Sequence, residues 1–420
     1  MASDPPAVPD PVSDNPFSYP AYRLFWATRA FAVLGGQALA VALAWQVYEV
    51  AKKAHGGDIK VAAFWLGVLG LVQFVPMLLL SLPAGETADR RDRRLIGSIC
   101  LVVDAACAAA FLALTLAGDP PLWALLALSV PFAASRAYIA PALTALVPRL
   151  IPREIMPRAI SMNSLAFQLG AIAGPGLGGA LIALSPATAY GTSAVLFAAA
   201  AATLLMLRAN TRPDPVSGSR WALMKEGLAY VWRTRIIFGA ISLDLVAVLL
   251  GGATLLMPVF AMDILHVGPQ GFGWMRAAPS VGAAAMALYL SMRHIRRNAG
   301  LWMFGGVAVF GAATIVFGLS QNLWLTLLAL FVIGAADMIS VNVRQTMIQI
   351  VTPDHMRGRV SSVSMVFISA SNELGEFESG VVARFLGPVG AAVFGGVGSL
   401  VATGLWAAWF PDLRKADRLT

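Results

Sequence analysis

Long apolar runs, separated by short polar or basic segments, recur from one end of the chain to the other. Each run holds about 20 residues, the length that an α-helix needs to cross about 30 Å of hydrocarbon. Dividing the runs at glycines, prolines and charge clusters predicts an all-α membrane protein with twelve transmembrane helices, at 22–48, 62–83, 95–117, 122–146, 159–183, 187–207, 236–262, 271–291, 300–318, 323–350, 359–385 and 389–410.

Composition agrees with this pattern. Of the 420 residues, 58% are hydrophobic and only 12% are charged, and the mean hydropathy is +0.73. Such a chain has too little polar surface to enclose a soluble core. Its two cysteines, Cys100 and Cys107, lie in one apolar run, so we expect neither a disulfide framework nor a metal–thiolate site. We expect no cofactor.

Basic residues predict the orientation in the membrane. The net charge is +8, but the basic residues are clustered between apolar runs, so nucleic acid is not expected as a partner. Loops after even-numbered spans hold most of the arginines, including Arg90, Arg91, Arg93, Arg94, Arg149, Arg153, Arg158, Arg293, Arg296, Arg297, Arg357 and Arg359. By the positive-inside rule, these loops and both termini are cytoplasmic, in a bacterial-type inner membrane.

The polar segments predict the domain organisation. Residues 1–20 hold six prolines and no Lys or Arg, and we expect a disordered N-terminal tail. Two six-helix halves follow, separated by a polar linker that we expect to carry an amphipathic helix on the membrane surface, with Trp221, Leu228, Tyr230 and Trp232 at headgroup level. The predicted divisions are 21–207, 208–235, 236–411 and a cytoplasmic tail at 412–420.

An internal repeat supports two similar halves. One offset of 201 residues relates Pro152 to Pro353, Arg158 to Arg359 and Gly174 to Gly375. Parallel repeats related by an axis along the membrane normal place a substrate path between the halves, near the bilayer midplane.

The loop between spans two and three carries a motif. It reads Gly85-Glu86-Thr87-Ala88-Asp89-Arg90-Arg91-Asp92-Arg93-Arg94, which resembles the signature of the major facilitator superfamily. The resemblance implies that Asp89 lies near a helix N-terminus, where the helix dipole favours its charge, and helps to hold the cytoplasmic side shut. It assigns conformational gating to Gly85, Asp89, Arg90 and Arg93. The alternative is a positive-inside anchor with incidental acidic residues.

The fifth span carries a second motif. Residues Gly170 to Gly179 contain a central Gly174-Pro175 and resemble the antiporter motif of the superfamily. The glycines permit close approach to a helix of the other half, and Pro175 permits bending, so we expect Gly174 and Pro175 to take part in gating. Ordinary small-residue packing is the alternative. Further segments resemble the drug-and-siderophore efflux branch that includes the enterobactin exporter family: 22–25, 42–48, 71–94, 242–261 and 337–380.

Ionisable residues inside spans are functional candidates, because each costs about 2.5–3.5 kcal/mol at the bilayer centre. The resemblance places spans one, four, seven and ten around a central cavity, and span ten is the most polar wall expected for substrate contact. For proton coupling we expect a desolvated carboxyl, first Asp244 or Asp337, or else the i, i+3 pair Glu373 and Glu376. The predicted substrate-binding and coupling residues are Arg29, Arg136, Asp244, Asp337, Asn342, Arg344, Glu373 and Glu376.

Static pairing between helices is the alternative for these charges, with Arg136–Asp104 and Arg344–Asp244 as the expected pairs. No phosphate-binding glycine loop, catalytic triad or metal-ligand cluster occurs in the sequence. We therefore expect no enzyme.

The sequence predicts a secondary active transporter, a monomer embedded in membrane lipid that exports a small amphipathic molecule, a drug or siderophore, in exchange for protons. One alternative is an importer or a lipid or lysolipid flippase of the same fold. Another is a membrane sensor or scaffold that no longer transports.

Overall fold

The structure is a computed structural model that describes residues 14–208, 220–293 and 297–416. The first half of the chain contains α1 (Pro20–Ala54), α2 (Ile59–Arg90), α3 (Arg93–Leu116), α4 (Leu122–Thr144), α5 (Met156–Leu184) and α6 (Pro186–Leu205), with 3₁₀ turns at η1 (Pro16–Ser18), η2 (Val147–Arg149) and η3 (Arg153–Ile155). These helices coincide with the first six predicted spans to within a few residues at most ends.

The chain continues with α7 (Arg220–Arg233), which lies in the predicted linker, and α8 (Arg235–Leu250), the first helix of the second half. The seventh predicted span then becomes irregular. The 3₁₀ turn η4 (Gly252–Leu256), the short α9 (Met257–Val259) and the π-helical turn η5 (Phe260–Ile264) continue it. The remaining helices are α10 (Gly268–Met292), α11 (Ala299–Leu319), α12 (Leu323–Val351), α13 (Asp354–Trp409) and α14 (Pro411–Arg414).

The described residues form helices and connections without any strand. Ten helical segments among them are long and apolar enough to cross a membrane, by length and composition. Helix α10, with 25 residues, is not one of the ten. Helix α13 counts once although it has 56 residues, which at 1.5 Å per residue would make a rod of about 80 Å.

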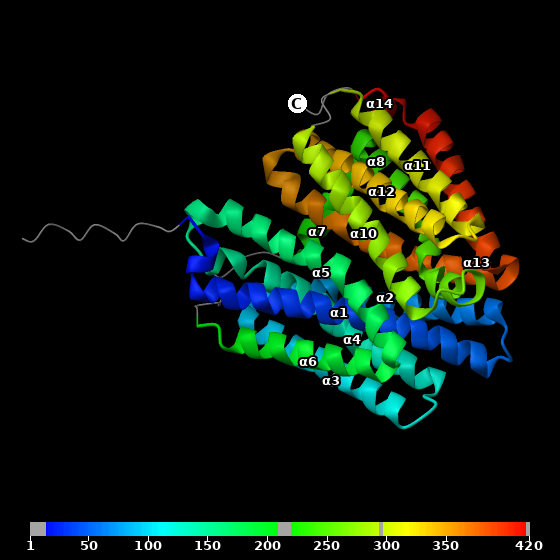
Figure 1. Cartoon of the computed structure of the whole chain (residues 1–420). Coiled ribbons are helices and arrows are strands. Elements are labelled where there is room, and N and C mark those ends of the chain that lie inside the picture. Colours follow the sequence, from blue (N-terminus) through cyan, green and yellow to red (C-terminus); the bar gives the residue numbers. More distant parts are fainter. Residues whose placement is uncertain (1–13, 209–219, 294–296, 417–420) are drawn as a thin grey trace, which may run out of the picture.

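A break divides α13 into two shorter helices. Gly387 has φ 78° and ψ 168°, a conformation that glycine adopts without strain, and Pro388 follows it. Figure 1 shows the orange and red parts of α13 meeting at one end of the molecule. The position matches the predicted boundary between the last two spans.

The two halves lie side by side, α1–α6 in blue to green and α8–α13 in green to red (Figure 1). Helix α2 packs along α13, and α5 packs along α10. Glycines make both contacts close. A Cβ built on Gly380 would lie 2.6 Å from the Cα of Gly67, and one built on Gly179 would lie 2.8 Å from the Cα of Gly273. The halves therefore meet backbone to backbone at these two crossings.

The repeat is visible in the backbone. Pro152 caps η3, just before α5, with φ −59° and ψ 152°, and Pro353 caps α13 with φ −56° and ψ 148°. Gly174 packs on Gln37 of α1, while Gly375 packs on Leu249 of α8, the first helix of the other half. Residues at the 201-residue offset thus start equivalent helices and make equivalent contacts.

The segments outside the bundles differ from the sequence expectations. Residues 14–20, expected in a disordered tail, include the ordered turn η1, and the carbonyl of Asp14 accepts a hydrogen bond from Arg158 at 3.0 Å. Residues 1–13 lie outside the described chain. At the other end, Leu413 is fully buried. Helix α14, whose residues Asp412 to Arg414 belong to the predicted cytoplasmic tail at 412–420, therefore packs onto the second half.

The amphipathic linker helix lies on protein. In α7 the apolar side, with Val231 buried and Leu228 beside it, packs against Val360 of α13. Glu226 pairs with Arg359 at 2.5 Å, and a Cβ on Gly227 would meet the Arg359 backbone at 2.9 Å. The expected membrane-surface helix is thus docked on the second half. The side chain of Trp221 lies outside the described residues; Trp232 remains exposed.

We predict that Gly380→Ala destabilises the protein, because the added methyl group would push α13 away from α2. Overpacking of this kind costs about 1–3 kcal/mol. Gly404→Ala is the matched control, because it lies in the same helix and a Cβ there meets nothing within 4 Å. Thermal unfolding of the detergent-solubilised variants should give a midpoint about 3 °C or more lower for Gly380→Ala than for Gly404→Ala. Equal midpoints would contradict the close crossing.

Candidate functional site

A cavity of about 500 Å³ lies between the two halves. Helices of both halves contribute polar side chains to it, and four phenylalanines cover part of its wall. The polar lining consists of Arg29 and Gln37 of α1, Gln73 of α2, Asp104 of α3, Arg136 of α4, Arg276 of α10, and Glu373 and Glu376 of α13; the aromatic lining consists of Phe132, Phe167, Phe197 and Phe272. The volume suits a drug-sized organic molecule.

The wall formed by the first half, here called the N wall, combines Arg29, Asp104 and Arg136. The guanidinium carbon of Arg29 lies 5.8 Å from the centre of the Phe167 ring, and that of Arg136 lies 5.8 Å from the centre of Phe132. Aromatic faces stabilise these cations where water is scarce. Asp104 is only 2% exposed. Its Oδ1 atom and the Nε atom of Arg29 are buried without a hydrogen-bond partner.

The wall formed by the second half, here called the C wall, combines Arg276, Glu373 and Glu376. The two glutamates are i, i+3 neighbours on α13 and interact electrostatically with Arg276 and with Arg136 of the opposite wall. Glu376 also reaches α2, where the missing side chain of Gly70 leaves room for it: a Cβ there would lie 3.2 Å from the Glu376 carboxylate. The glutamates thus connect the halves through charge.

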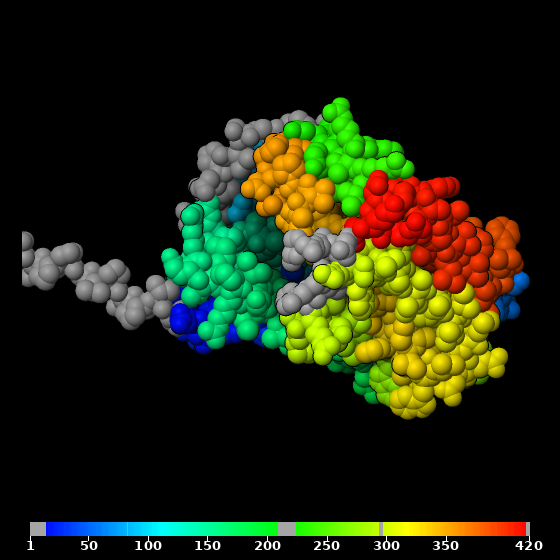
Figure 2. Space-filling model, turned by 90° about the horizontal axis from the view of Figure 1, so that it is seen from above, coloured from blue at the N-terminus to red at the C-terminus, as the bar shows by residue number. Residues whose placement is uncertain are grey.

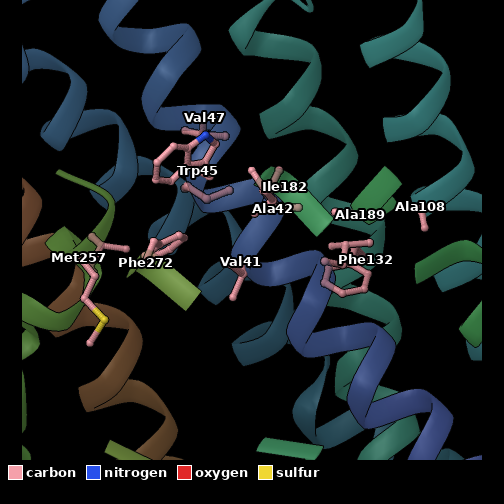
Figure 3. Packing of buried hydrophobic residues seen from close by; sticks show 14 of the residues in the cluster. Val41, Ala42, Trp45, Val47, Ala108, Phe132, Ile182, Ala189, Met257 and Phe272 are labelled. Carbon is pink, nitrogen blue, oxygen red and sulfur yellow. The ribbon is translucent and has the colours of Figure 1, made fainter. Parts of the chain in front are cut away.

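Aromatic packing forms the floor of the cavity. Trp45 of α1 stacks on Phe272 of α10, with 5.7 Å between ring centres and 29° between ring planes. Figure 3 shows Phe272 beside Met257, with Trp45 above it. Trp45 is 7% exposed and Phe272 is fully buried, so this aromatic contact is almost closed to solvent.

Beyond the floor, polar contacts join the halves. Asp263 of η5 accepts a hydrogen bond from Tyr48 at 2.5 Å and forms an ion pair with Lys52. Near them Arg384 approaches Asp58 at 3.6 Å. Asp58 also caps α2, and the backbone N–H groups of Val61 and Lys60 lower its pKa, with a smaller contribution from Arg384. We call the group Tyr48, Lys52 and Asp263 the polar gate.

The opposite end of the molecule is hollowed. Figure 2 shows a depression between the teal residues near the start of α5, the orange end of α12 and the yellow-green end of α10. These ends carry the loops that follow even-numbered spans. The structure is therefore closed at the polar gate and hollowed at the end predicted to be cytoplasmic.

Four of the predicted substrate and coupling residues line the cavity: Arg29, Arg136, Glu373 and Glu376. The expected polar wall from span ten is placed elsewhere. Arg344 and Asp244 form an ion pair in which the side chains are 1% and 6% exposed, and Ser340 donates to Asp244 at 3.2 Å. Asp337 interacts electrostatically with both partners of this pair.

This group does not line the cavity, and neither does Asn342. Asp337 and Arg344 are seven residues apart and share one face of α12, and that face turns toward α8. A buried arginine needs an acid nearby, and α8 supplies Asp244 from within the same half. The pairing that the sequence offered as a static alternative is thus formed.

The gating residues of the loop between spans two and three lie at the end of α2 and the start of α3. Asp89 lies in the last turn of α2. Asp92 caps α3: its side chain accepts from the N–H groups of Arg94 and Leu95. Arg93 donates to the carbonyl of Ala145 at 3.0 Å and ties this turn to α4.

The other gating residues have these contacts. Gly85 is buried in α2, and Arg90 forms an exposed i, i+4 pair with Glu86 at 2.7 Å. In α5, Gly174 packs within its own half on α1, whereas the carbonyl of Pro175 faces Gly273 of α10. The close approach to the other half is therefore made by Pro175 and Gly179.

Sequence reasoning did not select Asp104 and Arg276 as site residues, although both were visible as charges in apolar runs. They belong to spans three and eight, outside the four spans expected around the cavity. Gln37 and Gln73 gave a weaker signal, as isolated amides in apolar helices. Asp263 directly follows the predicted span 236–262 and was not selected.

Comparison with known proteins identifies the family of this chain. The family model described as transmembrane secretion effector matches residues 12–419. The multidrug efflux pump Tap of Mycobacterium tuberculosis is 27% identical over 423 residues, covering 95% of each protein. The enterobactin exporter EntS of Citrobacter koseri is 26% identical over 407 residues, covering 95% of this chain and 94% of its own.

The fold also occurs among solved structures. A POT family transporter in complex with 5-aminolevulinic acid superimposes with a TM-score of 0.71, covering 94% of this chain and 97% of its own. It is 13% identical in sequence, so the likeness concerns the fold alone.

We predict that Arg344→Met strongly destabilises the protein, because it leaves Asp244 buried and unpaired. Breaking a buried pair on one side costs about 3–5 kcal/mol. The double variant Arg344→Met/Asp244→Leu should regain at least half of the lost thermal stability in detergent. Arg357→Met is the control, since its pair with Asp354 is exposed and contributes at most about 1 kcal/mol. A stable single variant would show that the pair is dispensable.

We predict that Asp263→Asn opens the closed end, because it removes the acid that Lys52 and Tyr48 share. In a protein with Cys100→Ala and Cys107→Ala, Ala40→Cys places a thiol in the cavity lining. A membrane-impermeant maleimide added on the Asp263 side should label this thiol about tenfold faster in the Asp263→Asn variant, as the population of the open state rises. Labelling from the opposite side should slow.

Asp119→Asn is the matched control for this measurement. Its ion pair with Lys53 lies at the same end of the molecule, is exposed, and stays within the first half. If Asp119→Asn raises labelling as much as Asp263→Asn does, the effect is one of surface charge, and the polar gate does not hold this end shut.

Proposed function

Since the chain belongs to the transmembrane secretion effector family of the major facilitator superfamily, we propose that it exports a small amphipathic organic molecule across the bacterial inner membrane by alternating access. The observation that carries the proposal is the charged cavity between the halves, closed at one end by the polar gate and hollowed at the other. A cavity with access from one side at a time is what alternating access requires.

Twelve spans follow if α10 crosses the membrane and α13 crosses it twice, with the turn at Gly387. Both termini then lie on one side. The arginine-rich loops make that side cytoplasmic, so the state seen here opens inward. One chain supplies both cavity walls, and the transporter functions as a monomer of two halves, 21–207 and 236–411, joined by the linker that carries α7.

Export needs an energy source, and we propose that protons supply it through Glu373 and Glu376. The two carboxylates lie close together inside the cavity, so ionising one opposes ionising the other. They face Arg276 from α10 and Arg136 from α4, and α2 contributes the uncharged Gly70 and Gln73. Proton binding there would weaken the attraction between the halves and allow them to rock.

The relatives' names support the direction and breadth of this activity. One is a multidrug efflux pump and the other an enterobactin exporter. We therefore propose efflux, with Gly85, Asp89, Arg90, Arg93, Gly174 and Pro175 at the moving interfaces. A lipid flippase is less well supported, because charges from five helices converge on the cavity.

Transport into proteoliposomes tests this function. A panel of aromatic amines, aromatic acids, catechol siderophores and lysolipids is offered under an imposed pH gradient, and an enclosed pH-sensitive dye reports proton movement. We predict that at least one panel member drives proton flux opposite to its own movement, and that Glu376→Gln lowers this flux about tenfold or more.

Glu378→Gln is the matched control, since Glu378 lies on the same helix two residues away and does not line the cavity. It should retain at least half of the wild-type flux. Substrate movement without proton flux in the wild-type protein would disprove proton coupling. Equal losses in both variants would remove the special role of Glu376.

A further inference from the structure

The two walls of the cavity carry opposite formal charge. The N wall holds two arginines and one aspartate, and the C wall holds one arginine and two glutamates. With every group ionised, the N wall is +1 and the C wall is −1. A substrate that spans the cavity therefore meets a cationic surface on one side and an anionic surface on the other.

Two atoms of the N wall lack partners. Oδ1 of Asp104 and Nε of Arg29 are buried without a hydrogen bond, and Asp104 is 2% exposed. A buried polar atom left unsatisfied costs about 1–3 kcal/mol. A ligand that brings an acceptor to Arg29 and a donor to Asp104 recovers this energy, and an acidic group with a neighbouring hydroxyl or amide has both.

The coupling proposed above determines the charge at the C wall. In proton-for-substrate exchange, the substrate and the proton compete for the same groups. An acidic group at Arg136 would release Glu373 and Glu376 from their cationic neighbour and favour proton uptake together with substrate, which is symport. A cationic group at Glu373 and Glu376 excludes the proton, which is antiport.

We infer that the substrate class is an aromatic zwitterion. Its acidic group binds at Arg29, a hydroxyl or amide beside that group donates a hydrogen bond to Asp104, and its cationic group binds at Glu373 and Glu376. The aromatic body lies among Phe132, Phe167, Phe197 and Phe272, which line the same cavity. This inference rests on the proposed function, since exchange with protons fixes which wall holds the cation.

Equilibrium binding tests the inference without transport. Three probes share one ring system: 2-naphthylalanine is a zwitterion, 2-naphthylethylamine a cation and 2-naphthylpropionate an anion. Isothermal titration calorimetry on the purified protein at pH 7.5 should give a Kd for the zwitterion about tenfold or more below that of either other probe. Equal affinities, tighter binding of a singly charged probe, or no binding of the zwitterion would overturn the inference.

Variants identify the walls. Glu376→Gln should lower the affinity for the zwitterion to that for the anion, and should change the affinity for the anion by no more than about twofold. Arg29→Gln should lower the affinity for the zwitterion to that for the cation, and should change the affinity for the cation by no more than about twofold. Glu378→Gln should change none of these affinities. Arg29→Lys restores zwitterion binding at least in part if Arg29 acts through its charge, and thermal unfolding checks that each variant is folded. If Glu376→Gln instead lowers zwitterion affinity to that of the cation, and Arg29→Gln lowers it to that of the anion, the assignment of the two walls is wrong.

Acidification separates this inference from the function on which it rests. From pH 8 to pH 6, the zwitterion and the cation should bind about tenfold more weakly, the anion should not, and Glu376→Gln should abolish the difference. If proton-coupled flux is found but the zwitterion has no advantage, the substrate class is wrong and the function stands. If the zwitterion binds as expected but no substrate drives proton flux, the coupling is wrong and the binding site stands.

Discussion

The cost of placing charge in hydrocarbon governs where each ionisable group lies in this protein. Arg344 and Asp244 meet that cost by pairing within the second half, where almost no surface of either side chain remains exposed. A second set of charges converges from both halves on one cavity: Arg29, Asp104, Arg136, Arg276, Glu373 and Glu376. Charge that is paired within one half stabilises the structure. Charge that is balanced only between the two halves can take part in transport.

This division links the cavity to the polar gate. When Tyr48 and Lys52 engage Asp263, the halves are held together at one end, and the hollow between them lies at the other. Between these ends, the attraction of Glu373 and Glu376 for Arg136 acts across the same boundary. A ligand or proton that alters this attraction therefore changes how strongly the halves are held together without contacting the polar gate.

Much of the fold could be predicted because hydrophobic length and glycine–proline punctuation are local signals. The span limits, the break near Gly387 and the 201-residue repeat follow from these signals alone. The site was harder. Arg29, Arg136, Glu373 and Glu376 were found as charges in apolar runs, but the same criterion selected Asp337 and Arg344, whose face turns to α8. Which face of a helix meets the cavity depends on packing between distant segments, and helical spacing gives only the face. Asp104 was passed over because its helix was expected at the periphery.

The glycine crossings have a kinetic consequence. Where α2 meets α13 and α5 meets α10, glycines bring backbone against backbone. If leucines interdigitated at these crossings, their side chains would have to separate before the bundles could turn. Each separation would raise the barrier to the conformational change. At the glycine crossings, the bundles can turn against one another with few rotamer changes. The rate of turnover then depends on the charges in the cavity and on the polar gate.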